Sequence, residues 1–381
     1  MKIAFPHMGT LTTSMKSVFT KLDQEFIVPP PISGKTVQLG VKHSPELVCL
    51  PFKITLGNMI EALELGADTV VTATSCGNCR LGFYWPAQEI ILKELGYKFK
   101  MMAINYDNPL GFMAEFKKFG GGKSWLKVFN ALLFGVKKQR VLESLEKEAM
   151  RIRPLERRRG DTDRILRSAF ERVDLASTKK ELAHSKEASL SEFQRIEKSP
   201  GREPLRVMIV GETYMIVEPN VNFNLMAKLG DLGIHAERSY WLGERILRAL
   251  RLSPDGRRHH EMAKTYAYPY MRYPELCTGA LSIGETIAAK KDGFDGVILV
   301  MPFTCMPEVL SQSLMMKVSA EHSIPVLTVI LDEHSDDGAL LTRLEAFRDL
   351  LETKKRRSCA TRGYFLKEAS NLTMNSLPLS D

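Results

Sequence analysis

Long hydrophobic runs are missing from this chain, and cysteine is scarce. No apolar run approaches the roughly 18 to 20 residues that span a bilayer, and residues 1–14 lack the apolar core and the small-residue cleavage site of a secretory signal. Six cysteines in 381 residues are far below the density of a disulfide scaffold. We therefore expect a cytoplasmic protein without membrane contact, whose cysteines remain thiols for metal binding or catalysis.

The chain also lacks the features of a nucleic-acid-binding protein. Its net charge is +8, but Lys and Arg concentrate at 151–167 and 354–357, where they resemble solvated helix faces. No basic stripe with interleaved aromatic residues accompanies them. Nucleic-acid binding is therefore not expected, and an anionic small molecule or an acidic protein partner fits the charge equally well.

The length and the pattern of the chain predict an α/β fold with two domains. At 381 residues it exceeds one ordinary domain of roughly 100 to 200 residues. Strands alternate with helices over 1–110 and again over 205–355, which predicts two Rossmann-like parallel-sheet domains. Residues 111–204 are predicted to be a charged helical connector with too little apolar content for a core of its own. Residues 356–381 are expected to form a loose polar tail.

Individual strands and helices follow from β-branched runs and from helical periodicity. The predicted strands are residues 2–6, 47–49, 69–74, 99–104, 205–210, 234–239, 296–301 and 325–331. The predicted helices in the two domains are residues 52–65, 86–95, 222–232, 308–321 and 339–354.

Four cysteines lie at or just beyond the carboxyl ends of predicted strands: Cys49, Cys76, Cys79 and Cys305. Ligands of open α/β sheets bind at that edge, so we expect these residues to converge on one site between the domains. Cys277 and Cys359 are not expected to take part.

Two of these cysteines have the same local sequence. Cys49-Leu50-Pro51 and Cys305-Met306-Pro307 each adjoin a Pro-Phe pair. Proline fixes the chain beyond the sulfur, and the exposed amides of a strand-to-helix turn can hydrogen-bond to cluster sulfides. The repeated C-x-P pattern therefore favours an iron-sulfur cluster.

Other interpretations of the cysteines are weaker. A lone Cys49 or Cys305 could simply be a small buried hydrophobic residue. Cys76-Gly77-Asn78-Cys79 alone could be a redox dithiol or half of a zinc site. A thioredoxin-like dithiol usually opens a helix directly, and structural zinc favours a second C-x-x-C nearby, which the sequence lacks.

At these cysteines the sequence resembles the cluster-carrying D-component family of 2-hydroxyacyl-CoA dehydratases, and the related domain of unknown function in large activase-related proteins. The similarity covers about residues 1–110 and 205–355. The resembling segments are Glu46 to Lys53, Gly77 to Tyr84, Gly211 to Tyr214, Met301 to Glu308, Asp332 to Ser335 and Thr342 to Phe347.

The resemblance implies a cluster of the 4Fe-4S type or a double cluster, held by Cys49, Cys79 and Cys305. It also implies a homo- or heterodimer reduced by an actin-like ATPase activase. The chain has no G-x-x-x-x-G-K-[ST] loop, so it would receive the electron rather than hydrolyse ATP. Three thiolates leave one iron of a 4Fe-4S cube open. A fourth, from Cys76, would close it, and the sequence leaves this choice open.

Further polar residues at strand ends could line the same crevice, namely Glu212, Tyr214, Glu333 and His334. A strand-end acid is often only a helix cap or a turn former. Two other functions stay open: a subunit that dehydrates an acyl-CoA directly, and a regulatory or scaffolding member of the family without open-iron chemistry.

Overall fold

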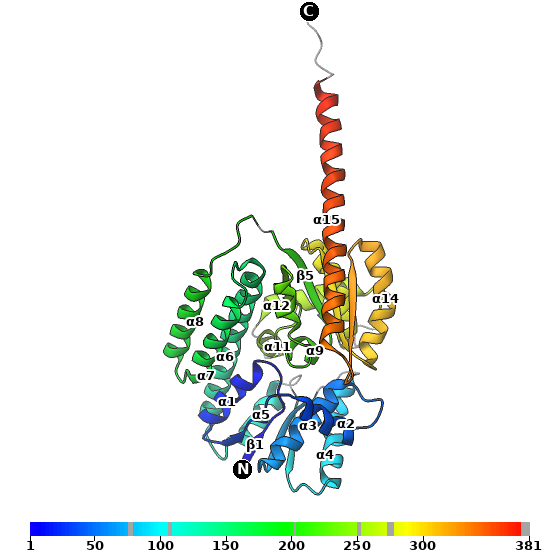
Figure 1. Ribbon diagram of the computed structural model, residues 1–381. Coiled ribbons are helices and arrows are strands. Elements are labelled where there is room, and N and C mark those ends of the chain that lie inside the picture. Colours follow the sequence, from blue (N-terminus) through cyan, green and yellow to red (C-terminus); the bar gives the residue numbers. More distant parts are fainter. Residues whose placement is uncertain (75–78, 106–108, 202, 250–252, 273–277, 375–381) are drawn as a thin grey trace, which may run out of the picture.

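The computed structural model describes residues 1–74, 79–105, 109–201, 203–249, 253–272 and 278–374 (Figure 1). Two separate four-stranded sheets, each with all strands parallel, define an α/β protein. Within the described residues, no helix combines the length and the apolar character needed to cross a bilayer.

The first sheet has the strand order β2-β1-β3-β4. Its strands are β1 (Lys2–Ala4), β2 (Glu25–Ile27), β3 (Thr69–Thr74) and β4 (Lys100–Asn105). Helix α1 (Leu11–Lys21) packs on one face, and α3 (Leu50–Glu64) and α4 (Tyr84–Glu94) pack on the other. The remaining helical elements are α2 (Gly34–His43), which packs on α3, and the short η1 (Arg80–Phe83).

The second sheet repeats this arrangement with the order β6-β5-β7-β8. Its strands are β5 (Leu205–Gly211), β6 (Ile234–Arg238), β7 (Gly296–Pro302) and β8 (Val326–Leu331). Every residue of β7 is buried, as expected of a central parallel strand with helices on both faces. The accompanying helices are α9 (Thr213–Val217), α10 (Leu225–Asp231), α11 (Leu242–Ala249), α12 (Pro254–Ala267), α13 (Thr278–Lys291), α14 (Met306–His322) and α15 (Asp337–Met374).

Helix α3 joins the two halves of the chain. Leu50 and Ile54 belong to the core that α9, α10 and α15 form on one face of the second sheet, while Phe52 and Leu56 belong to the core of the first sheet. The amino end of α3 is therefore fixed by both domains.

The segment between the sheets is helical, as predicted, but it has its own core. It consists of α5 (Pro109–Phe119), α6 (Trp125–Ile152), α7 (Asp161–Leu175) and α8 (Lys179–Gln194). Helices α6, α7 and α8 lie side by side (Figure 1) and bury Leu145, Val173 and Phe193 completely. The expectation that this charged segment lacks a core is wrong, because most of its charges lie on the outer faces of amphipathic helices.

The structure corrects three further expectations. Residues 47–49 are not a strand, because Cys49 is the N-cap of α3. Strand β2, only three residues long, was not predicted. Helix α15 continues to Met374 and projects beyond the rest of the protein (Figure 1), so most of the expected loose tail is helical.

Candidate functional site

Three cysteines each cap the amino end of a helical element. Cys49 precedes α3, Cys79 precedes η1 and Cys305 precedes α14. Both C-x-P segments place proline in the first helical turn, where its missing N–H costs nothing. Unpaired amides at a helix start favour negative charge and lower the pKa of a cysteine. We call Cys49, Cys79 and Cys305 the cysteine centre.

The repeated fold gives these cysteines different origins. Cys79 and Cys305 follow β3 and β7, which are the equivalent strands of the two sheets. Cys49 instead lies before the helix that leads into β3. The two C-x-P segments are thus alike in local structure but not in topological position.

Arg80 connects the three backbone segments of the cysteine centre. Its guanidinium donates one hydrogen bond to the Leu47 carbonyl oxygen, at 2.9 Å, and another to the Thr304 carbonyl oxygen. The Thr304 hydroxyl also donates to the Leu47 oxygen, at 3.3 Å. Arg80 follows Cys79 directly, and its acceptors Leu47 and Thr304 lie within two residues of Cys49 and Cys305. The Arg80 side chain therefore links the backbone segments of all three cysteines.

The backbone next to Cys305 is strained. Thr304 has φ of 64°, a left-handed conformation that a β-branched residue rarely adopts. Such conformations persist only where surrounding contacts enforce them, and they cluster at functional sites. The bonds to Leu47 and Arg80 supply that enforcement.

Tyr84 is a residue of the centre that sequence reasoning missed. Its buried hydroxyl oxygen lies 2.6 Å from Sγ of Cys49, and its ring packs edge-on against Phe52. Burial raises the pKa of Tyr84, and the neighbouring Cys49 and Cys79 sulfurs act in the same direction. Tyr84 therefore stays protonated and can donate a hydrogen bond to a Cys49 thiolate.

Two acidic side chains lie beside the cysteines. Glu212 caps α9 by accepting a hydrogen bond from the Met215 N–H at 2.9 Å, and burial raises the pKa of Glu212 to about 7. Glu308 is fully buried and accepts hydrogen bonds from Ser282 and Ser311. Burial also raises the pKa of Glu308. Glu212 was predicted as a site residue from the sequence. Glu308 was not, and its only indication was its position directly after the C-x-P motif of Cys305.

The electrostatics of the centre favour a cationic occupant. Burial raises the pKa of Cys49 and of Cys305, and Glu212 raises both further. Tyr84 and Arg80 oppose this at Cys49. Two thiols and two carboxyls thus share a buried region with one guanidinium group, and a positive metal group would stabilise their ionised forms.

Whether the donors fit a metal depends on the kind of metal group. Among the described residues, no set of three His, Cys, Asp or Glu side chains is close enough to bind one metal ion. A single zinc ion needs its sulfurs about 2.3 Å from the metal. The thiolates of an iron-sulfur cluster bind different irons, so a cluster does not require its cysteines to meet at one ion.

The other predicted residues have different positions. The Tyr214 hydroxyl is buried without a hydrogen-bond partner among the described residues. Glu333 forms an ion pair with buried Lys53 of α3, which links the end of β8 to the first domain. The His334 N–H donates to Asp332 in a turn. The predictions for Cys76 and Cys277 fall outside the described residues, and Cys359 lies in α15.

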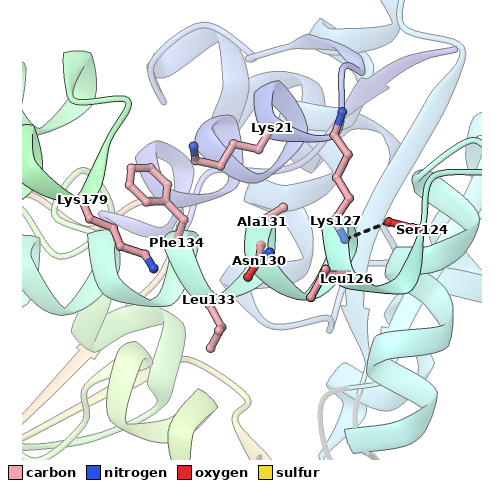
Figure 2. A pocket seen from close by; sticks show the side chains of 9 residues that line it. All are labelled: Lys21, Ser124, Leu126, Lys127, Asn130, Ala131, Leu133, Phe134 and Lys179. Atoms are coloured by element: carbon pink, nitrogen blue, oxygen red, sulfur yellow. Dashed lines mark hydrogen bonds between the residues drawn. The ribbon is translucent and has the colours of Figure 1, made fainter.

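A hollow lies away from the cysteines. It has a volume of about 510 Å³ and is lined by residues of α1, α6 and α8 (Figure 2). Its Lys21 donates to the Ser177 carbonyl oxygen and lies over the Phe134 ring, while Lys127 pairs with Asp23. These lysines serve the packing of the helical segment, and the hollow contains none of the predicted site residues.

No protein-family model matches the chain, and no curated protein matches it.

Proposed function

We propose that this chain is the cluster-carrying, electron-accepting component of a dehydratase-like or double-cluster reductase system. The single observation that carries the proposal is the arrangement of Cys49, Cys79 and Cys305, three helix-capping cysteines from two similar domains joined through Arg80. A bound iron-sulfur cluster would supply one-electron transfer, with its site in the crevice between the domains.

The side chains around the cysteines have complementary roles in this proposal. Cys49, Cys79 and Cys305 hold the cluster, and the helix amides behind them stabilise the negative charge of their sulfurs. Tyr84 donates a hydrogen bond to the Cys49 sulfur. Glu212, whose pKa is about 7, holds a proton near neutral pH that it can give up as charge changes nearby.

Partners follow from the same proposal. The electron comes from an actin-like ATPase activase, the chain acts as a homo- or heterodimer, and an acyl-CoA is the candidate substrate. The support is the resemblance of the cysteine segments to the D-component family.

Iron and sulfide analysis tests the proposal. Anaerobically purified protein should contain iron and acid-labile sulfide in similar amounts and give an EPR signal after reduction with dithionite. Cys49→Ser and Cys305→Ser should each lose most of the iron, whereas Cys359→Ser should retain it. Wild-type protein without iron and sulfide after anaerobic expression and cluster reconstitution would contradict the proposal and favour the regulatory or scaffolding function.

The role of Cys76 is tested separately. Because the family resemblance favours Cys79 as the ligand, Cys76→Ser should retain the iron and its EPR signal, and Cys79→Ser should lose them. An open iron in the wild-type cluster should then change its EPR signal when an exogenous ligand such as cyanide is added. Loss of iron in Cys76→Ser would instead indicate a fully ligated relay cluster.

A further inference from the structure

A second pocket lies in the C-terminal domain, beside the ends of two strands. It is lined by Gly211 at the end of β5, by Ser239 after β6, and by side chains of α11, α12 and α13. Its volume is about 70 Å³, which is room for one small oxyanion group and not for a whole drug-sized ligand. The carboxyl ends of parallel strands are also where α/β sheets bind ligands.

Arginine and histidine side chains converge on this pocket. Arg245 and Arg248 lie on α11, three residues apart and thus on the same face of the helix. His259 and His260 enter from α12. None of these residues belongs to the cysteine centre.

Burial and the neighbouring cationic groups disfavour the charged forms of Arg248 and His260. Burial lowers the pKa of Arg248, and the neighbouring Arg245 lowers it further. Burial also lowers the pKa of His260 to about 3, with Arg248 as the next cause. Within the described parts of the chain, Arg248 has neither a hydrogen-bond nor a salt-bridge partner. A half-buried guanidinium group without a partner is costly, and an anion in the pocket would remove that cost.

Two acidic side chains line the described part of the pocket, and neither forms a salt bridge with Arg248. Glu285 is bound by His259, whose Nε2 lies 2.9 Å from its carboxylate. That hydrogen bond raises the pKa of His259. Glu244 is exposed and is the only other carboxylate lining the described part of the pocket.

The remaining wall is rigid and polar. Thr278, Ser282 and Glu285 recur on one face of α13. Helix α13 lies so close to α12 that a Cβ at Gly284 would be 1.9 Å from the Ala263 carbonyl oxygen. The Ser282 hydroxyl of this wall donates to Glu308 of α14, and the tight helix contact keeps the wall in place.

We propose that this pocket binds the phosphate or carboxylate group of a small molecule, with Arg245 and Arg248 holding its oxygens. Guanidinium groups bind both kinds of oxyanion through paired hydrogen bonds. The site is separate from the three cysteines, but Ser282 of its wall donates to Glu308 in the first turn of the helix capped by Cys305. A ligand here would lie next to the cysteine centre.

Calorimetric titration of the full-length protein tests the inference. Inorganic phosphate and malonate are titrated separately at constant ionic strength, with chloride as the reference. Saturable binding of either anion is expected, and the tighter one identifies the preferred group. Absence of binding by both would overturn the inference.

Substitutions locate the binding. Arg248→Gln should weaken it at least about tenfold, because a charge-assisted hydrogen bond is lost. Arg245→Gln is the second variant if the first does not fold, and Arg258→Gln is the control, since Arg258 is exposed on α12 and does not line the pocket. Unchanged binding in a folded Arg248→Gln or Arg245→Gln protein would contradict the site.

This titration is independent of the proposed function. It requires no iron, and Cys305→Ser protein should bind the anion as the wild type does. A chain that binds phosphate but holds no iron would support the anion pocket and contradict the proposed cluster. A chain that holds a cluster but binds neither anion would support the cluster and contradict the anion pocket.

Discussion

The hydroxyl oxygen of Tyr84 lies 2.6 Å from Sγ of Cys49, and both side chains are buried. The two residues come from the starts of α4 and α3, on the same face of the first sheet. If Cys49 binds a cluster, this hydrogen bond stabilises the more negative, reduced form and raises the reduction potential.

Tyr84→Phe is therefore expected to lower that potential. A hydrogen bond contributes about 1 kcal/mol, and 1.4 kcal/mol corresponds to about 59 mV for one electron, so the shift should be at most about 40 mV. Redox titration monitored by EPR measures it. Tyr268→Phe, which changes an exposed side chain, should leave the potential unchanged, and an unshifted potential in Tyr84→Phe would argue against Cys49 as a ligand.

Arg80→Lys should loosen the cysteine centre. Lysine cannot reproduce the two-carbonyl contact of a guanidinium group, so the variant should lose about 1 to 2 kcal/mol of unfolding free energy and part of its iron. Denaturant unfolding and iron analysis measure the two effects. The control is Arg343→Lys, because Arg343 also donates to a backbone oxygen, that of Thr328, but away from the cysteines. Equal iron loss in both variants would refute a specific role for Arg80.

The sequence predicted the sheets better than the site. Strand β3 spans the predicted residues 69–74, because a β-branched run is a strong local signal. Residues 47–49 gave a similar apolar signal, yet Pro51 lies in the first turn of α3 and Cys49 is its N-cap. The proline at the second position of α3 therefore indicated the structure of this segment better than the apolar residues before it did.

Other features could be predicted only from spacing or not at all. In the sequence, the core of the helical segment is indicated by Ile165, Ala169 and Val173, which are spaced four residues apart. The average composition of the segment does not reveal this spacing. The contact of Tyr84 with Cys49 joins residues 35 apart in sequence, and no local pattern encodes it. The anion pocket likewise depends on the packing of α11 against α12.

The ion pair of Lys53 and Glu333 should stabilise the protein by holding α3 to the end of β8. The Lys53 side chain is 6% exposed, so Glu333→Gln leaves a buried charge without its partner. Although burial raises the pKa of Glu333, the bond from Lys53 outweighs it and the pKa is lowered. The stabilisation by this pair is therefore fully present above the pKa that Glu333 has in the unfolded chain. It is lost as pH falls through the lower pKa of Glu333 in the folded protein.

We expect Glu333→Gln to reduce the unfolding free energy by about 3 kcal/mol at pH 7. The double variant Lys53→Met, Glu333→Gln should be more stable than the sum of the single effects predicts. Glu64→Gln is the control, because Glu64 pairs with Lys35 on the surface and such pairs contribute about 1 kcal/mol or less. Additive single effects would show that the two side chains do not interact.

Lys138 gives the helical segment a distinct pH dependence. Its side chain is buried in α6 and donates to the Asp174 carbonyl oxygen, and burial lowers the pKa of Lys138 to about 8. The folded protein thus releases this proton near pH 8, while the unfolded chain keeps it to about pH 10.4. Between these values the unfolded state binds more protons, so unfolding free energy rises with pH. Relative to Lys138→Met, the wild type should gain about 2 kcal/mol from pH 8 to pH 10, measured by urea unfolding. The control is Lys180→Met, at an exposed position of α8, which should change the pH dependence of the unfolding free energy much less. If the unfolding free energy rises equally with pH in the wild type and in Lys138→Met, Lys138 stays charged in the folded protein.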